Sequence, residues 1–192
     1  IIDPVINGLK QDGIRYSGFL YAGLMITAED QAKVLEFNCR LGDPETQPIM
    51  LRLKSDLLPL IEHAVQGTLD EMHVEWDRRT AVGVVMAAQG YPENPRKNDV
   101  IYGLQDLVTE QQSTGDFHIF HAGTSMGGKN CNEIVTAGGR VLCVTALGDS
   151  IKIAHQTAYK LVDRIRFDGS QIRHDIGHHG MSYQHSNSEK RN

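Results

Sequence analysis

The stretch V-L-E-F-N-C-R-L-G-D-P-E-T-Q, residues 34–47, limits most strongly what this chain can fold into. Its first half has the apolar content of a strand, yet Glu36, Asn38 and Arg40 occupy every second position. Alternate residues of a strand share one face and lie about 6.6 Å apart. One face is therefore expected to carry a carboxylate, an amide and a guanidinium. The intervening side chains are expected to pack on the opposite face: Leu35, Phe37 and Cys39.

The polar face of this strand has the composition of a cation site. Glu36 and Asn38 offer side-chain oxygens without imidazole or thiolate, a donor set that suits Mg²⁺ or Mn²⁺. Arg40 can bind a carboxylate or phosphate through two parallel hydrogen bonds. A cation site beside such a group is what phosphoryl transfer to a carboxylate requires. The alternative is a sheet edge whose polar face is only hydrated, because isolated E-x-N matches are common.

The rest of the chain predicts an α+β protein with two parts. Residues 16–26 and 32–39 predict an antiparallel hairpin around the turn T-A-E-D-Q, and two helices are expected over 49–54 and 56–67. A final helix is expected from Ser150 to about residue 166. Short strands separated by Gly, Pro and Asn turns are expected at 81–88, 100–104, 117–122, 133–136 and 140–147.

These elements suggest a division of the chain near residue 76. We expect an α+β domain over residues 1–76 and a β-rich domain with one helix over residues 77–177. The polar, His-rich segment 178–192 is expected to be a disordered tail. The segment G-T-S-M-G-G-K-N, residues 123–130, nearly matches a phosphate-binding loop, but a strand-like run follows it, so we interpret it as a hairpin turn.

Composition excludes several classes of partner. The net charge is −5 and no cluster of Lys and Arg larger than a pair such as Arg78-Arg79 is present, which argues against nucleic-acid binding. No apolar run approaches the length of about 18 residues that a membrane span needs. The 3 cysteines form no C-x-x-C pair, and an odd number cannot all pair within the chain. A reducing cytoplasm is therefore the expected location.

The segment R-L-G-D-P-E-T-Q, residues 40–47, resembles the signature of the phosphoribosylamine–glycine ligase family, whose members are ATP-grasp enzymes. The resemblance implies the C-terminal part of an ATP-grasp fold, an antiparallel sheet with helices, followed by a small β-rich domain. Leu41 stands where the family signature normally has Phe, and the preceding strand lacks the acid found in many other ATP-grasp families. Further segments that are similar to this family are 16–25, 48–57, 82–92, 121–124, 138–148 and 173–177.

The resemblance also implies a reaction and roles for individual residues. ATP would phosphorylate glycine, and the amine of 5-phosphoribosylamine would attack the acyl phosphate to give glycinamide ribonucleotide, ADP and phosphate. Glu36 and Asn38 would hold Mg²⁺ or Mn²⁺, and Arg40 would bind the acyl phosphate or the glycine carboxylate. Asp43 is the candidate for the incoming amine, although an Asp-Pro pair can simply cap a turn. Arg140, after a Gly-Gly pair that resembles a two-residue hairpin turn, is the candidate for the substrate phosphate.

The chain begins at Ile1 with a helix-like segment, so it is expected to be the C-terminal portion of a longer ligase. The missing N-terminal half would carry the nucleotide-clamping lysine and the adenine pocket, and the chain alone is expected to be inactive. Two alternatives remain open. One is another ATP-grasp ligase with a different acid substrate, and the other is a non-catalytic β-rich interaction module.

Overall fold

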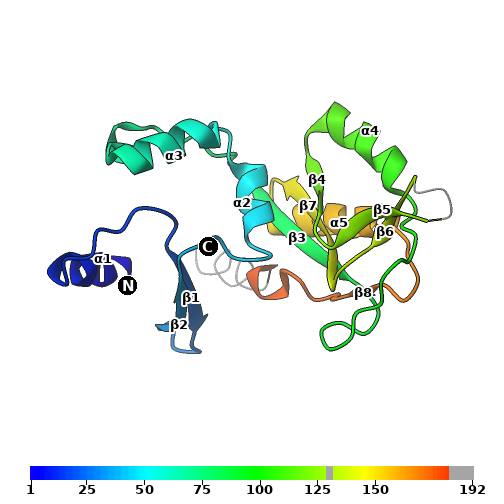
Figure 1. Ribbon diagram of the computed structural model, residues 1–192, viewed down its shortest axis with the longest axis horizontal. Helices are drawn as coiled ribbons and strands as arrows, with labels where there is room; N and C mark the ends of the chain where they lie inside the picture. The colour runs from blue at the N-terminus through cyan, green and yellow to red at the C-terminus, as the bar shows by residue number, and fades with distance from the viewer. Residues whose placement is uncertain (129–131, 182–192) are drawn as a thin grey trace, which may run out of the picture. The chain divides into compact units, whose positions relative to one another are not determined.

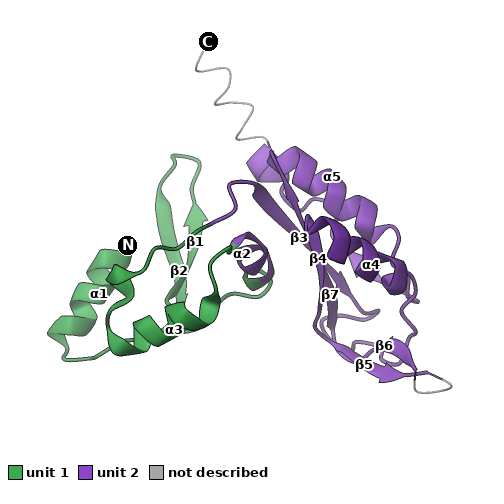
Figure 2. Cartoon of the chain, turned by 90° about the horizontal axis from the view of Figure 1, so that it is seen from above, with its two compact units in different colours: residues 1–46, 53–75 green, residues 47–52, 76–192 purple. Residues whose placement is uncertain are grey.

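The computed structural model of the protein describes residues 1–128 and 132–181. Helices and antiparallel strand pairs alternate along the chain, as the sequence predicts for an α+β fold. The chain divides into two compact units (Figure 2). Unit 1 comprises residues 1–46 and 53–75, and unit 2 comprises residues 47–52 and 76–192.

Unit 1 is built around the predicted hairpin. Strand β1 (Tyr21–Ile26) pairs antiparallel with β2 (Ala32–Asn38), which confirms the hairpin. The turn between them closes through Thr27, whose hydroxyl accepts hydrogen bonds from the backbone of Glu29 and Gln31. The other elements of unit 1 are the helices α1 (Ile2–Gln11), α3 (Leu57–Gln66) and the short η1 (Leu69–Glu71).

The expectation that one face of β2 packs against a core is wrong. Leu35 is 64% exposed, Phe37 is 41% exposed, and Cys39 is exposed as well. The buried apolar residues of the described chain all belong to unit 2. A hairpin of two strands cannot bury a face without a further layer, and the described part of unit 1 does not supply one.

Unit 2 is organised by a four-stranded antiparallel sheet in the order β4-β7-β3-β8 (Figure 1). The strands are β3 (Thr80–Ala87), β4 (Phe117–His121), β7 (Arg140–Gly148) and β8 (Gln171–Ile172). The helix α5 (Ile151–Val162) packs on β7 and β3. Its first turn is capped by Ser150, whose hydroxyl accepts a hydrogen bond from the backbone of Ile153 at 3.3 Å.

The core lies between this sheet and its helices. Val84 and Val144 of the two central strands and Ala154 and Ala158 of α5 are completely buried. Small alanines on α5 let the helix approach the β-branched side chains of the sheet closely, so apolar surface is removed from water on both elements. The unit thus has a packed core of its own.

Unit 2 contains a second helix, where the sequence suggested only one. Helix α4 (Leu104–Thr114) begins inside the segment 100–104 that was expected to be a strand. Only Val100 and Tyr102 make isolated β-bridges there. Leu104 and Leu107 are buried on the core side of α4, and most of the helix is polar. With two buried leucines one turn apart, its apolar periodicity is too weak to identify it from sequence.

The segment 123–130, which was interpreted as a hairpin turn, includes a strand. The segment 124–127 forms strand β5 (Thr124–Gly127), which pairs antiparallel with β6 (Glu133–Thr136), so no helix start follows it as a phosphate loop requires. Lys129 and Asn130 lie outside the described residues.

The prediction of a two-residue hairpin at Gly138-Gly139 is wrong, because β6 pairs with β5 whereas β7 pairs with β3 and β4. The two glycines connect strands of different sheets.

The C-terminal segment is described as far as residue 181. Residues 178–181 are helical, and the remainder of the expected disordered tail, 182–192, lies outside the described residues. Over the described ranges, no helix combines the length and apolar character needed to cross a membrane.

Candidate functional site

The register of the hairpin places the predicted polar residues on one face. Asn38 lies opposite Tyr21, and Glu36 lies opposite Gly23. Directly opposed residues of an antiparallel pair share a face, so Tyr21 joins Glu36 and Asn38 there. Gly23 leaves room for Glu36, because a Cβ atom at Gly23 would lie 3.0 Å from Glu36 Cγ. The hairpin thus forms a polar surface with the Glu36 stem lying over the neighbouring strand.

Asn38 has an unusual environment for an amide. Its Nδ2 atom is buried and has no hydrogen-bond partner among the described residues. A buried polar atom without a partner costs about 1–3 kcal/mol, so a native protein seldom leaves one without a reason. Rotating the amide by 180° exchanges its nitrogen and oxygen, so either atom can occupy this position. The side chain is therefore suited to receive a group that the described residues do not provide.

Arg40 does not continue the strand. Strand β2 ends at Asn38, and the next two residues form a bend, so strand alternation does not place Arg40 on the face of Glu36 as predicted. Its Nη1 donates instead to the carbonyl oxygen of Leu41 at 3.0 Å. The guanidinium nevertheless lies close enough to lower the pKa of Tyr21, whereas Glu36 acts in the opposite direction. The charges of Arg40 and Glu36 thus act on the same phenol.

The loop after Arg40 is closed and tightly packed. The backbone nitrogen of Thr46 donates to the Gly42 carbonyl at 3.0 Å, and the peptide bond between Asp43 and Pro44 is cis. A Cβ atom at Gly42 would lie 2.8 Å from Glu45 Cδ and 2.9 Å from Tyr21 Cε2. A side chain at this position would therefore require Glu45 and Tyr21 to shift. The Asp43 side chain is exposed at the tip of this loop.

Tyr21 and Glu45 are not among the site residues predicted from the sequence. The Tyr21 hydroxyl donates to Glu45 Oε1 at 3.4 Å, although the two residues are 24 positions apart. The Glu45 charge is the largest cause of a raised Tyr21 pKa, followed by burial, the hydrogen bond and Glu36. The sequence gives no signal for Tyr21, because its position opposite Asn38 follows from the hairpin register.

Replacing Glu45 with glutamine is expected to lower the pKa of Tyr21 toward its ordinary value. A nearby carboxylate disfavours the phenolate, so removing its charge makes deprotonation easier. The pKa can be followed by NMR titration of ring-labelled tyrosine at high pH. Glu29→Gln, in the turn of the same hairpin, is the matched control and should leave Tyr21 unchanged. An unchanged Tyr21 pKa in Glu45→Gln would show that the two side chains do not interact in solution.

The five residues predicted from sequence are divided between the units. Glu36, Asn38, Arg40 and Asp43 all belong to unit 1, on β2 and the loop that follows it. Arg140 belongs to unit 2, where it begins β7 opposite Ala87 and is exposed. Only the unit 1 residues are thus brought together by one hairpin and its loop.

Comparisons with known proteins give the family of both parts of the chain. Residues 1–46 match the family model "Phosphoribosylglycinamide synthetase, ATP-grasp (A) domain", and residues 81–179 match "Phosphoribosylglycinamide synthetase, C domain". The hairpin and its loop are therefore the C-terminal part of an ATP-grasp fold, and unit 2 contains the C domain that accompanies it. The chain belongs to the phosphoribosylglycinamide synthetase family.

Individual relatives support the same assignment. The chain is 54% identical over 181 residues to a phosphoribosylamine–glycine ligase of Ralstonia nicotianae, covering 94% of this chain and 41% of that protein. It is 51% identical over 182 residues to that of Yersinia pestis, covering 95% of this chain and 41% of that protein. The crystal structure of phosphoribosylamine–glycine ligase from Thermotoga maritima matches with a TM-score of 0.72 and 34% identity, covering 91% of this chain and 40% of that one. The chain thus spans about two fifths of the length of these relatives.

Proposed function

We propose that this chain is the C-terminal part of an ATP-dependent carbon–nitrogen ligase that joins glycine to 5-phosphoribosylamine in purine biosynthesis. The observation that carries the proposal is the hairpin surface, where Glu36 lies beside Asn38, whose amide nitrogen has no partner among the described residues, and the signature loop follows them. The relatives that match along nearly the whole chain bear the name of this ligase. We assign the reaction to the cytoplasm, the location expected from the cysteine pattern.

The donor set of Glu36 and Asn38 fits a hard divalent cation. Both offer oxygen, and the described chain holds no group of three or more His, Cys, Asp or Glu side chains that could bind a metal by themselves. A cation held by one carboxylate and one amide would need further oxygen ligands, and water and phosphate commonly supply these to Mg²⁺ and Mn²⁺. When bound, the cation would neutralise negative charge on the ATP phosphates. The Asn38 nitrogen has no hydrogen-bond partner among the described residues, and rotating the amide by 180° would place its oxygen there for this role.

The remaining residues would act on glycine and on the amine. A glycine carboxylate oxygen attacks the γ-phosphorus of ATP, so that ADP leaves and glycyl phosphate forms. We propose that Arg40 binds the acyl phosphate, because a guanidinium matches its oxygens in charge and geometry. The amine nitrogen then attacks the carbonyl carbon and phosphate leaves. Asp43, exposed on its loop, would accept a hydrogen bond from this amine, and Arg140 would bind the phosphate of its ribose.

The proposal is tested by ADP release from the chain extended upstream to the length of its relatives. Glycine and phosphoribosylamine are each added and withheld in turn, in the presence of Mg²⁺. Release is expected only when both are present. ADP release that does not change when glycine is withheld would show that the fold is used for another acid. ADP release in the absence of both glycine and phosphoribosylamine would exclude the ligase reaction.

A further inference from the structure

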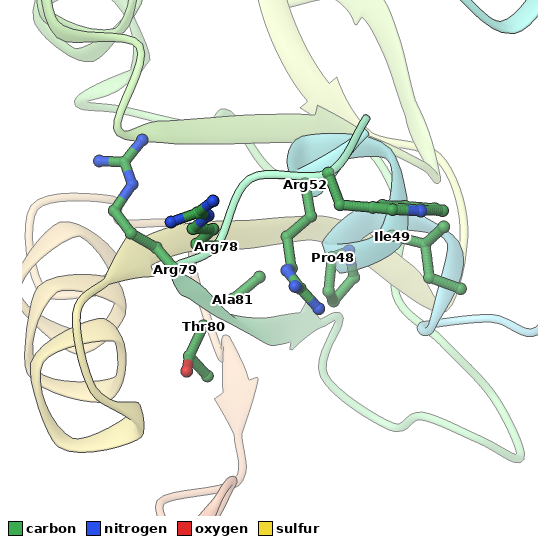
Figure 3. A pocket seen from close by; sticks show the side chains of 8 residues that line it. Pro48, Ile49, Arg52, Arg78, Arg79, Thr80 and Ala81 are labelled. Carbon is green, nitrogen blue, oxygen red and sulfur yellow. The ribbon is translucent and has the colours of Figure 1, made fainter. Parts of the chain in front are cut away.

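Unit 2 contains a pocket of about 550 Å³ at the junction of helix α2 (Thr46–Arg52) and the start of β3 (Figure 3). This volume lies within the range of about 300–1,000 Å³ typical of small-molecule sites. No acidic side chain stands among the described residues that line it. Residues on α2 and on the segment before β3 form most of the wall: Pro48, Ile49, Arg52, Trp76, Arg78 and Arg79.

Arg52 is held firmly in this wall. Its Nε and Nη2 atoms both donate to the carbonyl oxygen of Asp77, at 3.2 and 2.9 Å, and the Asp77 nitrogen donates back to the Arg52 carbonyl at 2.7 Å. These bonds engage a neutral carbonyl, so they fix the guanidinium without neutralising its charge. Figure 3 shows the side chain reaching from α2 toward the first residues of β3. Arg52 is thus a preorganised positive group.

The other two arginines differ in how their charges are compensated. Arg79 forms ion pairs with Asp77 at 2.8 Å and with Asp116 at 2.7 Å, and these hydrogen bonds raise its pKa. Arg78 is exposed and has no hydrogen bond or ion pair with another described side chain. The positive charge available to a ligand therefore comes from Arg52 and Arg78.

Trp76 gives the pocket an aromatic wall. Tryptophan is the most favourable side chain for stacking, and Trp76 is 46% exposed. It lines the pocket together with Pro48 and Ile49. Stacking of a nucleobase on an aromatic side chain contributes about 1–3 kcal/mol. Guanidinium groups bind phosphate oxygens in a matching geometry. A ligand that contains both a planar ring and a phosphate can therefore stack on the aromatic side chain and bind the guanidinium groups.

We propose that this pocket binds a nucleoside monophosphate, with its base stacked on Trp76 and its phosphate bound by Arg52 and Arg78. The inference rests on the pocket alone and is independent of the ligase reaction proposed above.

AMP, adenosine, ribose 5-phosphate and inorganic phosphate serve as probes for the 192-residue chain. Trp76 is the only tryptophan, so quenching of its fluorescence reports directly on the pocket, and calorimetry gives the affinity independently. AMP is expected to quench the emission saturably and to bind at least about 10-fold more tightly than adenosine, ribose 5-phosphate or phosphate, because each of these lacks one set of contacts.

Arg78→Met is expected to weaken AMP binding by about 10-fold, since a charged hydrogen bond is lost. Arg166→Met is the matched control, because Arg166 is also exposed in unit 2 but does not line the pocket. Trp76→Leu, followed by calorimetry, should also weaken binding. Both pocket variants change exposed side chains, and circular dichroism verifies that they fold. The proposal is overturned if AMP does not bind, if adenosine or ribose 5-phosphate binds as tightly, or if Arg78→Met and Arg166→Met behave alike.

Discussion

Replacing Glu36 with glutamine is expected to lower the rate of ADP release by about 100-fold or more in the chain extended upstream to the length of its relatives. Glutamine keeps the size of the side chain and removes its charge, so a hard cation loses its single carboxylate ligand on this strand. Losing a group that merely orients a ligand already costs about 10–100-fold in metal affinity or activity. The rate should be measured over a titration of Mg²⁺, because part of the loss is expected to reverse at high concentration.

Glu29→Gln provides the control for this substitution. Glu29 lies in the turn of the same hairpin and is exposed, and its replacement with glutamine changes the net charge by the same amount. It should leave both the rate and the Mg²⁺ dependence unchanged. Because Glu36 is itself exposed, its substitution should not alter the circular dichroism spectrum. An unaltered rate in Glu36→Gln would favour the interpretation of this strand as a hydrated sheet edge.

Replacing Leu107 with alanine is expected to lower the free energy of unfolding of unit 2 by about 2–5 kcal/mol. Leu107 is completely buried, so the truncation removes apolar contacts and leaves a cavity beneath α4. Urea unfolding followed by tryptophan fluorescence measures the change, because Trp76, the only tryptophan, belongs to the same unit.

Val108→Ala on the same helix is the matched control. Val108 is 40% exposed, so its truncation should change the free energy of unfolding by no more than about 0.5 kcal/mol. Alanine has a higher helix propensity than leucine or valine, so this contribution to the free energy of unfolding has the same sign in both variants. Similar small changes for the two variants would mean that α4 does not pack on the core in solution.

The elements that could be predicted from sequence are those governed by local patterns. The β1–β2 hairpin follows from two strand-like runs separated by a polar turn, and α5 follows from an amphipathic run that starts at Ser150. Helix α4 could not be predicted, because only Leu104 and Leu107 face the core. The Gly138-Gly139 connection has the composition of a tight hairpin, but the partners of β6 and β7 are chosen by sheet packing.

The sequence by itself determined the chemical character of the candidate site: a carboxylate and an amide on alternate strand positions, an arginine after them, and the loop that marks the family. Only the tertiary structure brought Tyr21 to Glu45 and Arg52 to the Asp77 carbonyl, pairs separated by 24 and 25 positions. The physical reason is that side-chain alternation depends on neighbouring residues alone, whereas such contacts depend on strand register and on how a helix packs at the edge of a sheet.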